Sequence, residues 1–266
     1  MPLAVCATPI GNLEDVTLRV LAELREADLV LAEDTRHTRG LLERHGIRAK
    51  LLSYHEHNEA ERVAELLPRL QAGERIALVS DAGMPAVSDP GARLVRAALD
   101  AGIDVTVLPG PSAVETALVA SGLAGGRYAF VGFLPRKRAE LEELWRETAE
   151  WGCAVVAFES PHRLATALRS LAAFDPERDV AVCRELTKRF EEVVRGTAAE
   201  LAARLVEPPK GEVTLVVGPG AAVSDPEPAR QAVAELVAAG TPRGVAAEVV
   251  ARLTDTSRND LYRGSL

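Results

Sequence analysis

The chain has 266 residues, enough for one large domain or for two modest domains with a small appendage. Hydrophobic residues make up 47% and charged residues 26%, a balance typical of globular proteins with packed cores. The net charge of −8 argues against a protein that coats nucleic acid through bulk electrostatics, although it leaves room for a local basic groove.

Strand-like and helix-like segments alternate through the first half of the chain. The predicted strands are Leu3–Thr8, Asp28–Asp34, Lys50–Tyr54, Arg75–Asp81 and Asp104–Leu108. The predicted helices are Val16–Arg25, Thr35–His45, Asn58–Gln71, Pro90–Ala101 and Ser112–Ser121. Continuous apolar strands separated by amphipathic helices are typical of a parallel sheet that is covered on both faces.

A loop at Gly122–Arg127 precedes a second α/β set. Its predicted strands are Tyr128–Phe133, Ala154–Phe158, Val180–Glu185, Glu191–Arg195 and Val213–Val217, and its predicted helices are Arg138–Glu150, His162–Ala173 and Thr197–Val206. The strands Glu191–Arg195 and Val213–Val217 are separated by one helix, which favours a partly antiparallel arrangement in this half. A linker at Pro219–Pro228 leads to helices at Ala229–Ala239 and Arg243–Leu253 and a turn at Ser257–Tyr262. We therefore expect α/β domains at residues 1–122 and 123–220 and a small helical tail at 229–266.

The three cysteines, Cys6, Cys153 and Cys183, lie far apart in apolar, strand-like runs. This pattern predicts buried free thiols in a reducing compartment and no disulfide framework. The segment Met1–Thr8 lacks the basic region of a secretory signal, and no stretch resembles a membrane span. We therefore expect a cytoplasmic protein.

Chemistry-bearing residues gather in the loops that follow the predicted strands, where parallel sheets place their sites. In the loop Glu33–Thr38, Asp34 or Thr35 is a plausible helix cap. Capping does not explain Arg36 and His37, because the dipole of a helix disfavours cations in its first turn. A bound anion, such as a phosphate of a nucleic acid, would remove that conflict.

Four of the five histidines lie close together, at positions 37, 45, 55 and 57. His55 and His57 alternate as on a strand, which would point both rings to one face and allow a metal site. A metal-dependent hydrolase that uses Glu33, Asp34, His37, His55 and His57 is therefore one alternative function. No HExxH spacing accompanies these residues.

The loop Val79–Gly91 carries the strongest signal. Pro90 in a first helical turn and Asp89 as its cap explain the second part of the loop structurally. Ser80, Asp81, Ala82 and Gly83 are left over, and they offer small side chains, backbone amides and a carboxylate to a ligand. No phosphate-binding P-loop, GxGxxG motif or Gly-x-Ser-x-Gly elbow occurs in the chain.

Nine short motifs, taken in order, resemble the tetrapyrrole-methylase superfamily, the class III methyltransferases. They are TPIGNLEDVTLR (8–19), AEDTRHT (32–38), YHEHNE (54–59), LVSDAGMPAVSDPG (78–91), LPGPSA (108–113), GFLPRK (132–137), FESPHR (158–163), RELTK (184–188) and KGEVTLVV (210–217). Within that superfamily they look most like the enzymes that methylate the ribose 2′-hydroxyl of a cytidine, cytidine 1402, in 16S ribosomal RNA.

The resemblance implies S-adenosylmethionine held in a cleft between two α/β domains, usually in a homodimer, with a small-subunit RNA substrate. The implied cofactor residues are Pro9, Ser80, Asp81, Ala82, Gly83, Val87, Ser112, Ala113, Gly132, Phe133, Phe158, Leu186, Val213, Thr214 and Leu215. The tail looks like the helix-turn-helix extension of some members. A small-molecule methyltransferase acting on a tetrapyrrole remains a second alternative function.

Methyl transfer to a hydroxyl needs in-line geometry and removal of a proton, and it needs no metal. Candidates for the general base or for orienting the hydroxyl are Asp34, His37, Glu185 and Lys188, although Glu185 and Lys188 fit a structural ion pair equally well. We also expect a basic rim around the cleft, formed by Arg36, His37, Arg136, Lys137, Arg163 and Lys188.

Overall fold

A computed structural model describes residues 2–220, 226–254 and 258–264 of the chain. By its internal contacts the chain divides into two compact units. The first unit runs to Trp145 and includes Cys153–Gly218, and it holds both sheets. The second unit contains Arg146–Gly152 and the chain from Pro219 onward.

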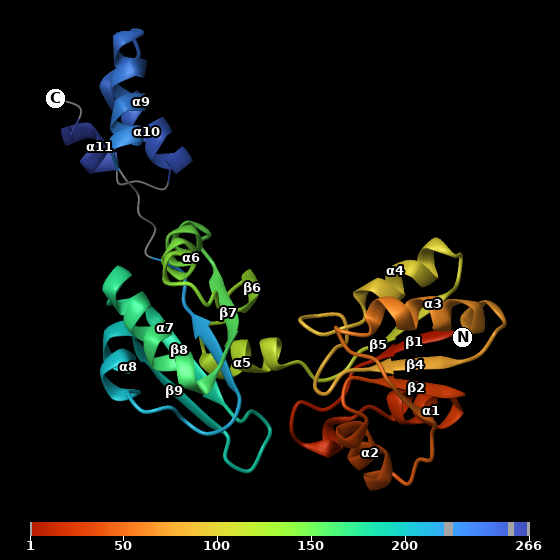
Figure 1. The fold of residues 1–266 in the computed structure, drawn as a ribbon. Coiled ribbons are helices and arrows are strands. Elements are labelled where there is room, and N and C mark those ends of the chain that lie inside the picture. The colour runs from red at the N-terminus through yellow and green to blue at the C-terminus, as the bar shows by residue number, and fades with distance from the viewer. Residues whose placement is uncertain (1, 221–225, 255–257, 265–266) are drawn as a thin grey trace. The chain divides into compact units, whose positions relative to one another are not determined.

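The first sheet is fully parallel and has the strand order β3-β2-β4-β1-β5 (Figure 1). Its strands are β1 (Leu3–Cys6), β2 (Leu29–Ala32), β3 (Leu51–Ser53), β4 (Ile76–Val79) and β5 (Val105–Leu108). The connecting helices are the 3-10 turn η1 (Leu13–Asp15), α1 (Leu18–Glu26), α2 (Thr35–Arg44), α3 (Glu59–Gln71) and α4 (Ala92–Asp100). This arrangement confirms the parallel sheet that the alternating pattern predicts.

Successive side chains of β1 point to opposite faces of this sheet, and each face has its own apolar core. Ala4 and Cys6 pack with buried residues of α1 and α2, such as Leu24. Leu3 and Val5 pack with residues of α3 and α4. Figure 1 shows these helices on the two faces. Burial on both faces is the reason why the strands are continuous apolar runs.

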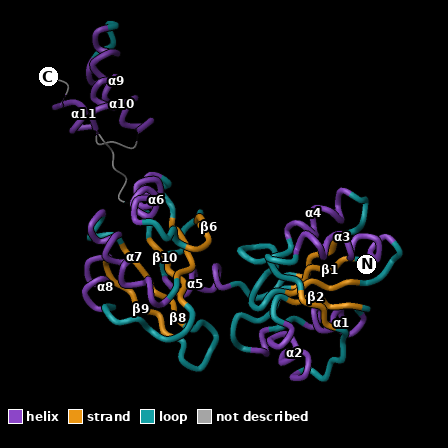
Figure 2. The backbone as a smooth tube through the Cα atoms, viewed as in Figure 1, coloured by secondary structure: helices purple, strands orange, loops and turns teal. Residues whose placement is uncertain are grey.

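The second sheet is mixed and has the strand order β6-β7-β10-β8-β9 (Figure 2). Its strands are β6 (Tyr128–Phe133), β7 (Ala154–Glu159), β8 (Asp179–Arg184), β9 (Glu192–Thr197) and β10 (Val213–Val217). Helix α5 (Ala113–Ser121) packs on one face, and α6 (Arg138–Glu150), α7 (Pro161–Phe174) and α8 (Ala198–Arg204) contribute to the core on the other. The partly antiparallel arrangement of this half is confirmed.

Strand β10 runs antiparallel to both of its neighbours, β7 and β8. Its first residue, Val213, pairs with Glu159 at the end of β7 and with Arg184 at the end of β8. The chain segment that enters β10 therefore lies at the same edge of the sheet as the segments that leave β7 and β8. This edge carries the residues of the site described below.

In the second unit, the described residues after Gly220 form the helices α9 (Pro226–Ala238), α10 (Arg243–Thr254) and α11 (Arg258–Gly264). They enclose a small core of their own, formed by Ala229, Val233, Ala246, Ala247, Val250 and Leu261. This confirms the predicted helical tail, of which residues 255–257 and 265–266 lie outside the described residues. In the part of the chain that the structure describes, no helix has the length and apolar character needed to cross a membrane.

All three cysteines are free. Cys6 and Cys183 are buried as expected, and burial raises the pKa of the Cys6 thiol to about 12. Cys153 is only half-buried, so the prediction of three buried thiols is wrong at this position. The reason is its place just before β7, where the strand has not yet entered the core.

Candidate active site

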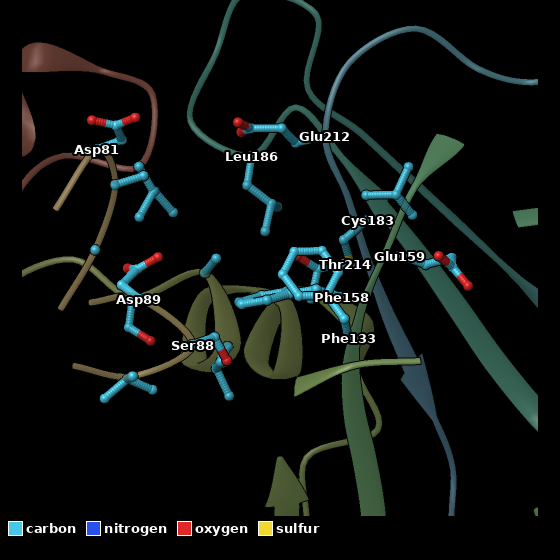
Figure 3. Close-up of a pocket in the computed structure, with 18 of the residues that line it drawn as sticks. Asp81, Ser88, Asp89, Phe133, Phe158, Glu159, Cys183, Leu186, Glu212 and Thr214 are labelled. Atoms are coloured by element: carbon cyan, nitrogen blue, oxygen red, sulfur yellow. The ribbon is translucent and has the colours of Figure 1, made fainter. Parts of the chain in front are cut away.

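A cavity of about 500 Å³ lies at the carboxyl ends of the strands of the first sheet (Figure 3). From the first half of the chain it is lined by Ile10, Glu33 and residues 81–84, 87–89 and 112–114. From the second half it is lined by Phe133, residues 158–161, Cys183, Leu186 and residues 211–214. The first group follows β1, β2, β4 and β5, which is where an open parallel sheet binds its ligands.

The turn between β4 and α4 has a strained backbone. Ala86 and Ser88 have φ values of 67° and 62°, and Gly91 has a φ of 136°. An external carboxylate holds this turn, because Glu59 Oε1 accepts the Gly91 N–H at 3.1 Å and the Tyr54 hydroxyl at 2.9 Å. Strained backbone conformations of this kind persist only where the surrounding structure holds them in place, and they concentrate at functional sites.

The predicted start of α4 at Pro90, with Asp89 as its cap, is wrong. The helix begins at Ala92, and Gly91 occupies the cap position with a backbone that is not helical. A side chain at Gly91 would also approach Leu78 Cδ2 to 2.7 Å, so only glycine fits this turn. The additional turn residues leave Asp89 to line the cavity.

A second strained turn follows β8. Glu185 and Thr187 have φ values of 52° and 64°, and with Ala86 and Ser88 they are the positive-φ residues other than glycine in the described chain. The Thr187 hydroxyl accepts the N–H of Asn12 at 2.9 Å, which joins this turn to the loop after β1. All four strained residues thus lie in two turns that border the cavity.

Two of the predicted catalytic residues, Glu185 and Lys188, lie in this second turn and do not line the cavity. Lys188 Nζ is 2.9 Å from Glu185 Oε1 and 2.8 Å from Glu212 Oε2. Hydrogen bonds from Lys188 and from the Glu212 N–H hold the pKa of Glu185 below its ordinary value. The structural ion pair, which the sequence left open, is therefore present.

One wall of the cavity is acidic. Glu33 follows β2, and Asp81 and Asp89 follow β4. Among the described residues that line the cavity, none is a lysine, arginine or histidine. Burial, followed by the negative charge of Glu33, raises the pKa of Asp89 to about 6, and a hydrogen bond from Ser80 opposes this rise. Burial and the charge of Asp81 likewise raise the pKa of Glu33.

The opposite wall is apolar and aromatic. The rings of Phe133 and Phe158 meet edge to face with centroids 5.5 Å apart. Figure 3 shows these rings and Leu186 across the cavity from Asp81 and Asp89. Phe133 is 64% exposed and lines the cavity, so a ligand bound there would cover part of its ring.

Most of the predicted cofactor residues line this cavity. They are Asp81, Ala82, Gly83, Val87, Ser112, Ala113, Phe133, Phe158, Leu186, Val213 and Thr214. Pro9 and Ser80 lie beside it, around a small pocket that they share with Asp81. Gly132 precedes the lining residue Phe133, whereas Leu215 is buried in the core between the second sheet and its helices.

Of the other two predicted catalytic residues, Asp34 is the N-cap of α2 and His37 lies in the first turn of that helix. His37 borders the small pocket around Pro9, and Asp34 caps α2 by accepting the Arg36 N–H. The Arg36 side chain also binds the Asp34 carboxylate, and these hydrogen bonds lower the pKa of Asp34. The cation in the first turn of α2 is thus balanced by its own cap, so the inference of a bound anion is unnecessary.

The geometry behind the metal alternative is also wrong. His55 and His57 lie in the turn after β3 and not on a strand, and their rings meet edge to face with centroids 5.9 Å apart. Across residues 2–220, 226–254 and 258–264, no group of three or more His, Cys, Asp and Glu side chains is placed to hold a metal ion.

The basic rim is largely engaged in local pairs. Lys137 binds Glu140 at 2.8 Å. Arg163 lies 3.2 Å from Glu159 and donates to the carbonyls of Leu134 and Pro135. Arg163 therefore holds the segment that follows Phe133.

Sequence reasoning missed Glu33, Ser88, Asp89 and Glu212 as lining residues. Glu33 stands directly before Asp34 in the AEDTRHT motif, and the sequence suggests a role for it only in the metal-dependent alternative. Asp89 was assigned to a cap, a role that explained it without a ligand. The signal that could have identified it is the second Ser-Asp pair in the same loop.

Two α/β halves with a strand-end cavity, one acidic wall and one aromatic wall define a protein that binds a small molecule with a cationic centre and a flat ring. S-adenosylmethionine combines a sulfonium and an ammonium group with an adenine ring, so the residues present fit it. A volume of about 500 Å³ is within the range of small-molecule sites.

Comparison with known proteins identifies the family. Residues 2–202 match the tetrapyrrole (corrin/porphyrin) methylases. The chain is 45% identical to the ribosomal RNA small subunit methyltransferase I of Mesorhizobium japonicum, over 98% of this chain and 90% of that protein. It is 44% identical to the protein of that name from Synechocystis sp., over 99% of this chain and 97% of the relative.

A solved structure has the same fold. The uroporphyrin-III C-methyltransferase of Thermus thermophilus, complexed with S-adenyl homocysteine, superposes with a TM-score of 0.57 and 22% identity, over 81% of this chain and 96% of that one. The chain belongs to the tetrapyrrole methylase family. It is a methyltransferase that uses S-adenosylmethionine.

Proposed function

We propose that the protein methylates the 2′-hydroxyl of a cytidine ribose, cytidine 1402, in the 16S ribosomal RNA of the small subunit. The observation that carries this proposal is likeness along almost the whole chain. Two relatives named for the methylation of small-subunit ribosomal RNA align with 98% and 99% of it, and the alignments cover at least 90% of each relative.

In this proposal the cofactor supplies an electrophilic methyl group on a sulfonium. The acidic wall of Asp81 and its neighbours would stabilise the cationic centre, and Phe133 and Phe158 would cover the adenine ring. The residues proposed to bind it are Pro9, Ser80, Asp81, Ala82, Gly83, Val87, Ser112, Ala113, Gly132, Phe133, Phe158, Leu186, Val213, Thr214 and Leu215. Asp34, His37, Glu185 and Lys188, which lie beside the cavity, would orient the reacting hydroxyl.

The test supplies labelled S-adenosylmethionine with three substrates: naked 16S RNA, assembled small subunits, and a tetrapyrrole such as uroporphyrinogen III. We expect label in ribosomal RNA. A methylated 2′-oxygen cannot attack its own phosphate, so the RNA should resist alkaline cleavage at the modified cytidine. Label in the tetrapyrrole alone, or in RNA that is still cleaved at every cytidine, would contradict the proposal.

The proposal includes a homodimer, a cytoplasmic location beside the ribosome, and α/β domains at residues 1–122 and 123–220 with a tail at 229–266. Deletion of residues 229–266 tests whether the tail contacts RNA. We expect the deletion to weaken small-subunit binding about tenfold or more, a loss of ~1.4 kcal/mol, with cofactor affinity unchanged. Sedimentation of the full chain and of the deletion distinguishes this result from a tail that serves the dimer.

A further inference from the structure

Some of the acidic groups that line the cavity already form ion pairs or hydrogen bonds with other protein groups, and others do not. Glu212 binds Lys188, and its side chain is 74% exposed. The Glu159 side chain is fully buried beside Arg163 and lies on the face of β7 that α7 covers. Lys188 therefore balances the charge of Glu212, and the Glu159 carboxylate is inaccessible to solvent.

Two further groups are also engaged. Asp81 Oδ1 accepts the N–H of Asp34 at 3.0 Å, which fixes this carboxylate at the end of β4. Cys183 directs its thiol to the carbonyl of Ala117, and burial raises its pKa to about 11, so it holds its proton. Glu33 and Asp89 remain, and both carry a pKa raised first by burial, although Asp89 also accepts a hydrogen bond from the Ser80 hydroxyl.

Of these two carboxylates, Asp89 is better placed to act on a ligand in the cavity. It is half-buried and directly follows Ser88, one of the strained residues, in the turn that Glu59 holds through Gly91. Figure 3 shows Asp89 on the side of the cavity opposite Phe133 and Phe158. The charged groups that act on it are Glu33, which follows β2, and Asp81, which follows β4, and both are negative. No cation therefore competes for its lone pairs among the described residues that line the cavity.

We propose that the Asp89 carboxylate accepts the proton of the hydroxyl that is methylated. This inference rests on the proposed function, because only a hydroxyl substrate presents that proton. As the hydroxyl oxygen forms its bond to the methyl carbon, the carbon–sulfur bond breaks and its electron pair stays on sulfur. The proton moves to Asp89, which becomes a neutral carboxylic acid and later releases the proton to water.

The electrostatics of the cavity support this role. A general base works best when its pKa lies near the working pH, and the surroundings of Asp89 raise its pKa toward that range. The negative charge of Glu33 contributes to the raised pKa of Asp89. In this proposal Glu33 therefore adjusts the pKa of the base, and Asp89 accepts the proton. A cationic cofactor in the same cavity favours the ionised carboxylate, and Asp89 is then ready to accept a proton when both substrates are bound.

The decisive experiment measures single-turnover methylation of small subunits at saturating S-adenosylmethionine, between pH 4.5 and 8.5, because the bound cationic cofactor lowers the pKa of Asp89 below its value in the free protein. Asp89→Asn keeps the shape of the side chain and removes the base. We expect its rate to fall by at least about 100-fold and to lose the acid limb of the wild-type profile. Asp89→Glu should recover part of the rate, and Glu33→Gln should move the acid limb to lower pH. Asp104→Asn, an exposed change just before β5, is the matched control.

A second measurement is independent of turnover. Calorimetry at pH 6 in buffers of different ionisation enthalpy should show that cofactor binding to the wild type releases about half a proton, because Asp89 becomes ionised. Asp89→Asn should release almost none. If Asp89 only balanced the charge of the cofactor, the variant would bind it more weakly but regain the wild-type rate at saturation, and that result would overturn the inference.

The position of the methyl group separates the two proposals. If the wild type places it on a 2′-oxygen and Asp89→Asn retains a rate within threefold, the proton acceptor is wrong and the proposed function stands. If the wild type methylates a base atom or no RNA, the proposed function fails and the inference fails with it.

Discussion

Gly11 is the point where the loop after β1 meets the turn after β8, and its substitution by alanine tests how tightly they fit. A Cβ atom at Gly11 would lie 2.5 Å from Lys188 Cγ and 2.7 Å from Thr187 Oγ1. It would also lie 2.9 Å from the carbonyl oxygen of Leu186. The Lys188 stem can move aside, but the Leu186 carbonyl belongs to the backbone. Thr187 is held in place by the N–H of Asn12.

The geometry sets the expected magnitude. Ordinary contact begins at 3.4 Å, so the two turns must separate by about 0.5 Å for the carbonyl and more for the side chains. Overpacking of this kind costs about 1–3 kcal/mol of unfolding free energy. Because Leu186 lines the cavity, the same displacement moves one wall, and we expect affinity for S-adenosylhomocysteine to fall about tenfold, or ~1.4 kcal/mol.

Urea denaturation and calorimetry with S-adenosylhomocysteine measure both effects. Gly40→Ala is the matched control, since Gly40 lies within α2 with nothing within 4 Å of its added Cβ. That variant should gain about 0.5–1 kcal/mol, because alanine favours helix more than glycine does. A Gly11→Ala protein with wild-type stability and affinity would refute the idea that this contact sets the position of the wall.

Two further predictions concern the strained turn. The pKa of Asp89 is raised from 3.8 to about 6 in the folded protein. Between these values the folded state keeps a proton that the unfolded chain has lost, so stability falls as pH rises through this window. Asp89→Asn should therefore gain on the order of 2 kcal/mol at pH 8 and nothing below pH 4, measured by urea titration; an equal gain at both pH values would exclude this origin. Glu59→Ala should cost about 2–3 kcal/mol, because it leaves the buried Tyr54 hydroxyl and the Gly91 N–H without their acceptor, whereas Tyr54→Phe should cost only about 1 kcal/mol. Thermal unfolding of the two variants side by side tests this order, and equal losses would contradict it.

Much of the fold follows from the sequence because burial on both faces forces long apolar runs. The predicted bounds of Tyr128–Phe133 and Val213–Val217 agree with the structure at both ends. Turns were harder to predict, because several residues can serve as a cap and the choice depends on a backbone angle. The φ of Gly91 is far from helical, so the helix begins at Ala92. Asp89 and Pro90, which the sequence assigns to the cap and the first helical turn, therefore belong to the preceding turn.

The candidate site was predictable in part for a related reason. Strand-end loops are recognisable in sequence, so residues such as Ser112 and Asp81 could be placed at one edge of the sheet. Contacts between distant segments are not visible in that way. The hydrogen bond between Asn12 and Thr187 joins positions 175 residues apart, and no local sequence pattern predicts it. Whether Glu185 and Lys188 take part in chemistry stays a prediction, because their ion pair explains them structurally.

The strand order of the second sheet has a consequence for how the chain folds during synthesis. Strand β5 ends at Leu108, so the first sheet is complete when less than half of the chain exists. The second sheet places β10 between β7 and β8, and β10 is its last strand in sequence. Until Val217 has emerged from the ribosome, two hydrophobic strands present unpaired edges, and a chain truncated before Val213 would expose them permanently. Such a truncated chain should aggregate, whereas one that ends after Val217 has every strand it needs.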